Sequence, residues 1–304
     1  MTTGRVAAVD IGTNSVRLLI QEPTGQPLLR EMYITRLGEG VDVANSLQPA
    51  AIERTVRVLA SYGALIAQHS VSRVRAAATS AARDAHNREE FFDAAESALG
   101  SRPELLSGED EAALSFQGAT QGLAATAAPF LVIDIGGGST EFVLGERTPA
   151  AAISVPLGCV RMTERHIATD PPDTAELDAC AADVRSVLAS VRARVDVAQA
   201  ATVIGVAGTI TSLAHLQQGC LRYAPELTHH SRLQRVAVEL LCGRLAAAPL
   251  VPRRALLADP KRAEVIVAGA VILRTILQEL AIPELVVSES DILDGLAASL
   301  LEQH

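Results

Sequence analysis

The sequence predicts an α/β protein built from two similar domains. Segments with strand and helix periodicity alternate along the chain of 304 residues, a length typical of about two domains. Residues 6–20 and 131–145 repeat one pattern, and the aspartates in the two copies, Asp10 and Asp134, lie 124 positions apart (134 minus 10). Alternation of this kind indicates mixed sheets covered by helices. The repeat indicates that each domain begins in the same way.

Each copy of the repeat is predicted to form a β-hairpin. The first copy reads VAAVDIGTNSVRLLI and the second LVIDIGGGSTEFVLG, so each has an apolar strand, Asp-Ile-Gly, a small polar loop and a second apolar strand. Glycine in such a turn permits positive φ and lets another group approach the backbone closely. We therefore expect two hairpins whose tips bind phosphate.

The remaining elements follow from apolar spacing and from turn residues. In the first half we expect helices over 49–69, 88–99 and 109–126 and a strand over 71–78. In the second half we expect helices over 173–195, from about 210, over 232–248, 262–281 and 291–302, and strands over 201–207 and 285–287. The predicted boundary gives domains 1–126 and 127–304, and helix 291–302 is a candidate to cross back onto the first domain.

Composition excludes several classes of protein. The chain is 49% hydrophobic and 20% charged, which is typical of a globular protein. A net charge of -9 disfavours a general nucleic-acid binder, and 3% aromatic residues without tryptophan provide few platforms for stacking bases. The uncharged stretch 112–133 contains two glutamines and Pro129, so we expect a helix, a break and a buried strand there, with no membrane span.

The cysteines and the N-terminus favour a reducing compartment. None of the four cysteines forms a C-x-x-C pair or lies at zinc-finger spacing from a histidine, so we expect buried free thiols. The N-terminal residues run directly into a strand pattern without a signal peptide. We therefore expect a cytoplasmic protein, and a homodimer is compatible with the sequence.

The two hairpin loops supply the first candidate ligands for an anion. Backbone N–H groups and hydroxyls at both tips can donate to phosphate oxygens. Asp10 and Asp134 end the leading strands, where a carboxylate can hold Mg²⁺ directly or through water. One such hairpin alone is equally well a structural turn, but two near-copies favour a functional role. The candidate phosphate ligands are Gly12, Thr13, Asn14 and Ser15 in the first loop and Gly136, Gly137, Gly138, Ser139 and Thr140 in the second.

A third loop and one arginine add weaker signals. In residues 203–214, VIGVAGTITSLA, a strand meets Ala-Gly-Thr and a helix then begins, so Gly208 and Thr209 lie where a helix N-terminus favours an anion. Many α/β turns look alike, so this loop carries weight only together with the hairpins. Arg83 follows a strand end and offers a planar donor fork to phosphate, although a surface arginine near a helix start looks the same.

An acidic run supplies the candidate catalytic base. Glu109, Asp110 and Glu111 are crowded at the predicted start of a helix. The simplest interpretation is that acids favour helix N-termini. The functional interpretation makes one of them a general base, because clustered like charges raise the pKa of a carboxylate and improve it as a base.

Taken together, these motifs resemble the exopolyphosphatase and pppGpp phosphohydrolase (Ppx/GppA) family. This family belongs to the superfamily of acetate and sugar kinases, heat-shock chaperones and actin. The resemblance implies the actin-like ATPase superfold in its two-domain form, with a cleft between the domains. The matching segments, in family order, are DIGTNSVRLLI (10–20), ATSAARDAHN (78–87), SGEDEA (107–112), DIGGGSTEF (134–142), PLGCVRMTER (156–165), GVAGTITSLA (205–214) and AEVIVAGAVIL (263–273).

The resemblance also implies a role for individual residues. The family's catalytic base falls on Glu111, and the acids that support metal and phosphate binding fall on Asp134 and Glu141. Arg17 and Arg83 match the family's phosphate-facing arginines. The implied reaction is in-line attack of water on the terminal phosphorus of inorganic polyphosphate, assisted by Mg²⁺ or another divalent cation.

Three positions depart from the family pattern. Asp110 replaces the first acid of the family's Glu-Glu pair, and Ala207 replaces the first glycine of the third loop. In the closing segment 290–295, Leu293 occupies the place of a common arginine, which bears on how the outer part of the substrate is held.

Three other functions remain open from the sequence. The first is hydrolysis of the 5′-triphosphate of pppGpp, which the scarcity of aromatic residues disfavours because a guanine pocket needs stacking partners. The second is a kinase of the same superfamily, but the chain resembles the sugar kinases only in its loops. The third is a non-catalytic polyphosphate or nucleotide sensor, which the presence of Glu111, Asp134 and Glu141 disfavours.

Overall fold

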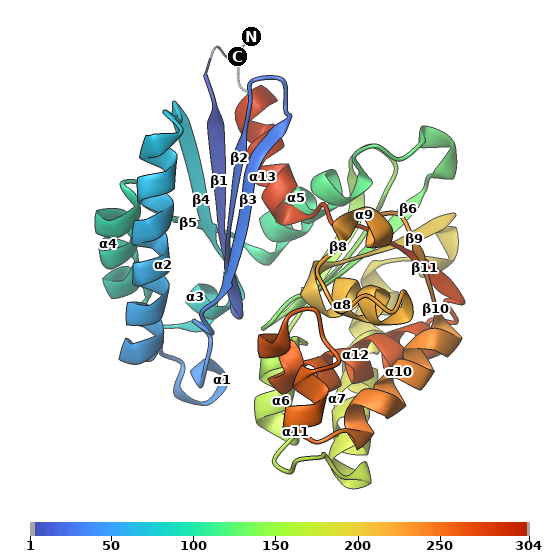
Figure 1. Ribbon diagram of the computed structural model, residues 1–304. Helices are drawn as coiled ribbons and strands as arrows, with labels where there is room; N and C mark the ends of the chain where they lie inside the picture. The colour runs from blue at the N-terminus through green and yellow to red at the C-terminus, as the bar shows by residue number, and fades with distance from the viewer. Residues whose placement is uncertain (1–3, 303–304) are drawn as a thin grey trace. The chain divides into compact units, whose positions relative to one another are not determined.

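The chain folds into two compact α/β units. A computed structural model describes residues 4–302. Unit 1 comprises the chain up to Gly118 together with the segment that starts at Asp291, and unit 2 is Ala119–Ser290. Each unit contains one sheet and its own helices (Figure 1).

The two sheets share one topology. In each, an antiparallel hairpin and a third antiparallel strand occupy one side, and two strands parallel to the first hairpin strand follow on the other side. The sheet of unit 2 has one further strand at that edge, which is antiparallel to its neighbour. Unit 1 has the order β3-β2-β1-β4-β5, with β1 Val6–Ile11, β2 Ser15–Gln21, β3 Pro27–Ile34, β4 Arg73–Ala78 and β5 Glu104–Leu105. Unit 2 has the order β10-β11-β9-β6-β7-β8, with β6 Phe130–Ile135, β7 Thr140–Gly145, β8 Pro149–Val155, β9 Thr202–Val206, β10 Arg232–Gln234 and β11 Glu284–Val287. This duplication confirms the predicted architecture of two similar α/β domains.

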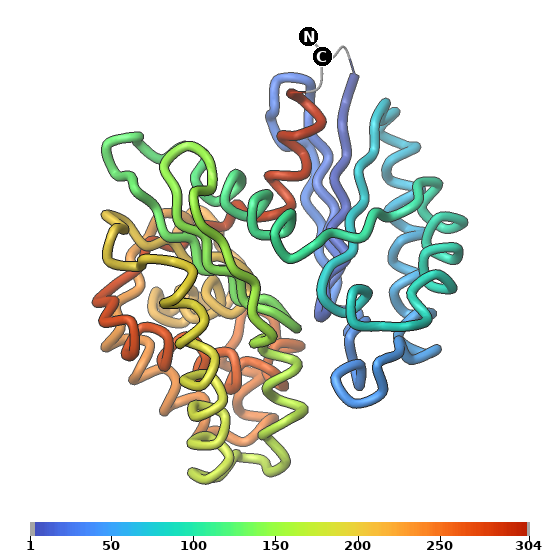
Figure 2. The backbone as a smooth tube through the Cα atoms, turned by 180° about the vertical axis from the view of Figure 1, so that it is seen from behind, coloured from blue at the N-terminus to red at the C-terminus, as the bar shows by residue number. Residues whose placement is uncertain are grey.

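Helices cover both faces of the unit 1 sheet. Helices α2 (Pro49–Gln68) and α4 (Arg88–Leu99) close a core on one face, and α5 (Gly108–Thr120) and α13 (Ile292–Glu302) close a second core on the other. Strand β1 and α13, which lie at opposite ends of the sequence, run side by side in both views (Figures 1 and 2). The shorter helices are α1 (Val41–Ala44) and α3 (Ser80–Asp84).

Two glycines allow α5 and α13 to pack in direct backbone contact. A Cβ atom at Gly118 would lie 1.8 Å from the carbonyl oxygen of Asp291, and one at Gly295 would lie 2.1 Å from the carbonyl oxygen of Leu114. Only glycine fits at these positions without backbone movement. The start of α13 is therefore fixed against α5.

The unit 2 core lies between its sheet and a layer of long helices. This core joins side chains of α7 (Thr174–Arg194), α10 (Arg235–Ala247) and α12 (Ile266–Glu279) to the apolar face of the sheet. Helix α7 begins with a capping box between Asp173 and Glu176. The other elements are α6 (Cys159–His166), α8 (Ala207–Gln217), α9 (Pro225–Thr228), α11 (Leu250–Arg254) and the 3₁₀ turns η1 (Ala125–Ala127), η2 (Val197–Gln199) and η3 (Pro260–Glu264).

Several predicted elements have different bounds. The helix predicted over 109–126 ends at Thr120, the one over 232–248 begins with strand β10, and the one over 262–281 is a 3₁₀ turn followed by α12. Strands β3 and β8 were not predicted. Both are third strands with many exposed or half-buried residues. Strand β3 mixes charged with apolar residues, and β8 is built largely of alanine, so neither has the run of large apolar side chains that marks the hairpin strands.

Two predictions from composition can also be compared with the structure. Within residues 4–302, no helix is long and apolar enough to cross a membrane. All four cysteines are free, as expected, but only three are buried, because Cys220 follows α8 in a partly exposed turn.

Candidate active site

The two hairpins place polar side chains at equivalent positions. Asp10 lies opposite Arg17 in the β1–β2 register, and Asp134 lies opposite Glu141 in the β6–β7 register. Directly opposed residues of an antiparallel pair share one face of the sheet. The first hairpin therefore pairs an acid with an arginine, whereas the second pairs two acids.

Both loops close with the same turn. The Gly12 N–H donates to the Ser15 carbonyl at 2.9 Å, and the Gly136 N–H donates to the Ser139 carbonyl at 3.0 Å. The N–H groups inside each turn donate to no backbone carbonyl within residues 4–302. A run of backbone N–H groups without internal acceptors is the usual construction of an anion-binding loop.

In the first loop, a neighbouring segment binds the carbonyl groups. The Thr13 carbonyl accepts from the Gly38 N–H, and the Asn14 carbonyl accepts from the N–H groups of Thr35 and Arg36, all within 3.1 Å. The Asn14 side chain is only 6% exposed, and neither its nitrogen nor its oxygen has a partner among the described residues. Such a buried amide is costly unless a bound group satisfies it. The side chain of Asn14, a predicted phosphate-binding residue, can therefore bind a phosphate group.

In the second loop, the start of α6 binds the carbonyl groups. The N–H groups of Cys159 and Val160 donate to the carbonyls of Gly136 and Gly137 at 3.0 and 2.9 Å. Arg161 donates from Nε to the Gly138 carbonyl at 2.8 Å and brings positive charge to the loop. These bonds hold the loop carbonyls on the α6 side.

The candidate base and one candidate phosphate ligand form an ion pair in unit 1. Glu111 Oε2 accepts from Arg83 Nη1 at 3.0 Å, and the same nitrogen also donates to the Leu106 carbonyl at 3.0 Å. Glu111 is 8% exposed, whereas Glu109 and Asp110 are exposed. The Asp110 N–H and carboxylate both bond the Ser107 hydroxyl, in the manner of a helix cap. Of the three acids, only Glu111 is buried beside an arginine.

The third loop gains an arginine that the sequence analysis missed. A Cβ atom at Gly208 would lie 1.8 Å from Nη1 of Arg262, so this guanidinium lies directly over the glycine at the N-terminus of α8. Ala207 has a φ of 68°, a left-handed conformation that favours glycine. Thr209 is buried and forms a hydrogen bond with the Cys159 thiol. Burial raises the pKa of this thiol, although Arg262 and the bond to Thr209 oppose the rise.

The loops of each unit meet at one edge of its sheet. In unit 1, β1 and β4 run parallel, and the Thr79 N–H donates to the Ile11 carbonyl, so the first loop and the segment carrying Arg83 are neighbours. In unit 2, β6 and β9 run parallel with Asp134 opposite Val206, so the second and third loops are neighbours. Ligands of α/β proteins bind at this carboxyl edge of parallel strands.

Arg17 and Asp10 bind one another. The Nε of Arg17 donates to Oδ2 of Asp10 at 2.9 Å, and Nη2 lies 2.8 Å from the same oxygen. The Nη1 of Arg17 forms an ion pair with Asp291. Burial raises the pKa of Asp10 although Arg17 opposes the rise. Burial lowers the pKa of Arg17, but Asp291 and Asp10 more than offset this and hold it well above its usual value. Asp10 thus uses one carboxylate oxygen to bind a cationic side chain.

Asp134 and Glu141 fit a divalent cation better. They are 7% and 1% exposed, and Glu141 Oε1 accepts from the Ser154 hydroxyl at 2.6 Å. Mg²⁺ is commonly held by one or two carboxylates together with substrate phosphates. No group of three or more His, Cys, Asp or Glu residues within 4–302 is arranged to hold a metal. The donor set is therefore one that substrate would complete.

One predicted hydroxyl ligand has a different task. The Thr140 hydroxyl is fully buried and donates to the Leu157 carbonyl at 2.5 Å, so its proton is committed to the fold. Sequence reasoning missed Arg161, Arg262 and Asp291. Arg161 lies inside the family-like segment 156–165, and Arg262 directly precedes the segment 263–273. Proximity to these motifs was the only feature of the sequence that indicated a place for these two arginines in the site.

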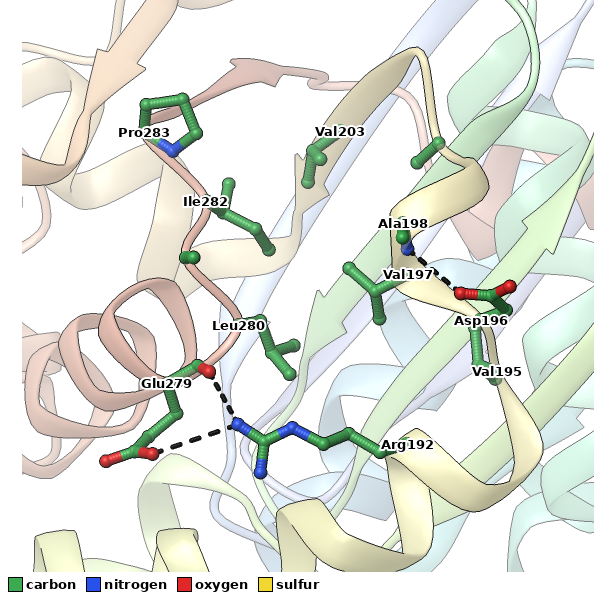
Figure 3. A pocket seen from close by; sticks show the side chains of 12 residues that line it. Arg192, Val195, Asp196, Val197, Ala198, Val203, Glu279, Leu280, Ile282 and Pro283 are labelled. Carbon is green, nitrogen blue, oxygen red and sulfur yellow. Dashed lines mark hydrogen bonds and ion pairs between the residues drawn. The ribbon is translucent and has the colours of Figure 1, made fainter.

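A cavity in unit 2 lies at the other edge of the sheet from the loops. Its volume is about 450 Å³, and residues just before or early in β9 and β11, such as Val203 and Pro283, contribute to its walls. Arg192 at its rim contacts the carbonyl of Glu279 at 2.5 Å and the carboxylate of that residue at 3.8 Å (Figure 3). The walls are mostly valine, leucine, isoleucine and alanine side chains, which cannot hold a chain of phosphates.

Comparisons with known proteins identify the family of this chain. The Ppx/GppA phosphatase family matches residues 19–304. The chain is 43% identical to Exopolyphosphatase 2 of Mycobacterium tuberculosis over 99% of both chains. A crystal structure of an exopolyphosphatase-like protein is 35% identical, with a TM-score of 0.94, and covers 98% of this chain and 99% of its own. An Aquifex aeolicus member of the Ppx/GppA family is 32% identical, with a TM-score of 0.77 and 99% of both chains covered. The chain therefore belongs to the Ppx/GppA phosphatase family.

Proposed function

We propose that this protein is an exopolyphosphatase, a phosphoanhydride hydrolase that releases terminal orthophosphate from inorganic polyphosphate. The observation that carries the proposal is the loop built twice. In both loops the carbonyl groups are bound by neighbouring segments, and the inner N–H groups have no backbone acceptor within residues 4–302. The name of the Mycobacterium tuberculosis relative, 43% identical over nearly the whole length, supports polyphosphate as the substrate.

The proposed reaction assigns a task to each group of residues. In unit 1, Glu111 accepts the proton of the attacking water, and Arg83 holds Glu111 and offsets phosphate charge. The N–H groups and the buried amide of Asn14 hold phosphate oxygens. In unit 2, the loop 136–139, Gly208 and Arg262 provide further donors. A divalent cation held by Asp134 and Glu141 would offset charge on the phosphoryl oxygens.

A comparison of substrates tests this function. Purified protein is given inorganic polyphosphate, pppGpp, ATP and a sugar with ATP, and released orthophosphate and phosphorylated sugar are measured. The expected result is orthophosphate release that is fastest with polyphosphate. Faster release from pppGpp would move the assignment to the other activity named for the family, sugar phosphorylation would make the protein a kinase, and binding without turnover would make it a sensor.

Hydrolysis is expected to require a divalent cation. The substrate is a polyanion, and in a partly desolvated site it is strongly repelled by the buried carboxylates of Asp134 and Glu141, which also repel each other. A cation of high charge density offsets this repulsion. Excess chelator should stop turnover, and added Mg²⁺ should restore it. Glu141→Gln should raise the Mg²⁺ concentration needed for half-maximal rate, and Mg²⁺ should raise its melting temperature less than that of the unaltered protein. Undiminished turnover in chelator would remove the metal from the mechanism.

A further inference from the structure

Arg17 is shared between two carboxylates. Its Nε and Nη2 face one oxygen of Asp10 at 2.9 and 2.8 Å, and its Nη1 pairs with Oδ2 of Asp291, which lies 274 positions further along the chain. Asp10 and Asp291 are 4% and 3% exposed, and the Arg17 side chain is about one-fifth exposed. All three guanidinium nitrogens are therefore engaged inside unit 1.

The charges of this cluster do not balance. With both acids ionised, one guanidinium faces two carboxylates, which leaves a net charge of -1 beside the first phosphate loop. Arg30 does not correct this, because it pairs with Asp294. An incoming phosphate competes with Asp291 for Nη1 of Arg17, since guanidinium binds carboxylate and phosphate with the same fork.

Asp291 is held in place by its backbone. Its carbonyl oxygen lies directly beneath Gly118 of α5, and its Oδ1 accepts from the Leu293 N–H at 3.1 Å as a cap of α13. The Asp294 carboxylate accepts from the Asp291 N–H at 3.0 Å, so both acids bind backbone N–H groups at the start of the helix. The Arg17 side chain can therefore rotate away from Asp291 toward a ligand, and the start of the helix stays folded.

We propose that Asp291 competes with substrate phosphate for Arg17 and so sets the affinity of the first loop for the phosphate chain. The inference rests on the proposed function, because it takes Arg17 as a phosphate ligand. Asp291 is a positioning residue: it acts on substrate only through Arg17.

The test is the exchange Asp291→Asn. Asparagine caps helices as well as aspartate does, so α13 keeps its cap while the competing charge is lost. KM for polyphosphate should fall about tenfold (about 1.4 kcal/mol). The Kd for a non-hydrolysable imido analogue of a short polyphosphate, measured by calorimetry, should fall by the same factor. The change in kcat should be much smaller, because contacts made equally in ground and transition states alter KM alone.

Asp294→Asn is the matched control. It removes one charge from the same helix start, but Asp294 pairs with Arg30 and not with Arg17, so KM should change far less. In a protein that already carries Arg17→Ala, Asp291→Asn should have no further effect on Kd, because the two residues act as one unit.

Two results would overturn the inference. One is a Kd for the analogue that is unchanged or higher in Asp291→Asn, with a normal melting temperature. The other is a lowered Kd that persists in the Arg17→Ala background. Failure of the unaltered protein to hydrolyse polyphosphate would instead refute the proposed function, because the calorimetric measurement needs no turnover.

Discussion

Glu111→Gln is expected to lower the rate of polyphosphate hydrolysis by about 10²–10⁴-fold, the usual effect of losing a general base. Glutamine has the size of glutamate and can still accept the hydrogen bond from Arg83 at the position of Oε2, so the fold should be unchanged. It cannot take a proton from water. Polyphosphate binding should survive, because a negative charge is removed beside an anion. Turnover, melting temperature and equilibrium binding are measured on the same preparation.

The neighbouring acids provide the controls for this variant. Glu109 and Asp110 are exposed, and Asp110 interacts with the Ser107 hydroxyl at the helix start. Glu109→Gln and Asp110→Asn should each cost about 0.3–1 kcal/mol of stability at most and leave turnover nearly intact. If Glu111→Gln instead behaves like these two and keeps more than about a tenth of the normal rate, Glu111 is not the base.

The architecture was predictable because its strongest signal is local. The Asp-Ile-Gly hairpins are short stretches in which strand, turn and strand are contiguous, so the duplication could be found by comparing residues 6–20 with 131–145. The third strands β3 and β8 could not be found in this way. They lie next to hairpin strands that are already buried. Many residues of β3 are exposed, and β8 is mostly half-buried and rich in alanine, so no alternation of apolar and polar residues marks either strand.

The polar contacts of the site were predictable only in part. Glu111 and Arg83 both lie in recognisable motifs, but the ion pair between them is a tertiary contact that neither motif implies. Asp10 and Arg17 were assigned to metal and phosphate separately, although their opposed positions in one hairpin make them partners. The contribution of Asp291 to that pair depends on the return of the chain to unit 1, and no local pattern carries it.

Gly158→Ala is expected to damage the second phosphate loop directly. A Cβ atom at position 158 would lie 2.2 Å from the carbonyl oxygen of Gly137 and 2.4 Å from the nitrogen of Gly138. These are backbone atoms of the loop itself, so relief requires the loop to move away from the start of α6. That movement breaks the bonds from Cys159 and Val160 that hold the loop carbonyls. A displacement of about 1 Å in a phosphate-binding loop can cost about 10²-fold in rate.

Overpacking in unit 2 should also lower stability, so the rate must be separated from folding. Gly158→Ala should cost about 1–3 kcal/mol of unfolding free energy. Gly243→Ala is the matched exchange in the same unit, because nothing lies within 4 Å of a Cβ atom there and the residue is inside helix α10. It should stabilise the protein by up to about 1 kcal/mol and leave turnover unchanged. Rates are measured well below both melting temperatures. Full turnover by folded Gly158→Ala would show that hydrolysis does not depend on the position of the Gly136–Ser139 loop.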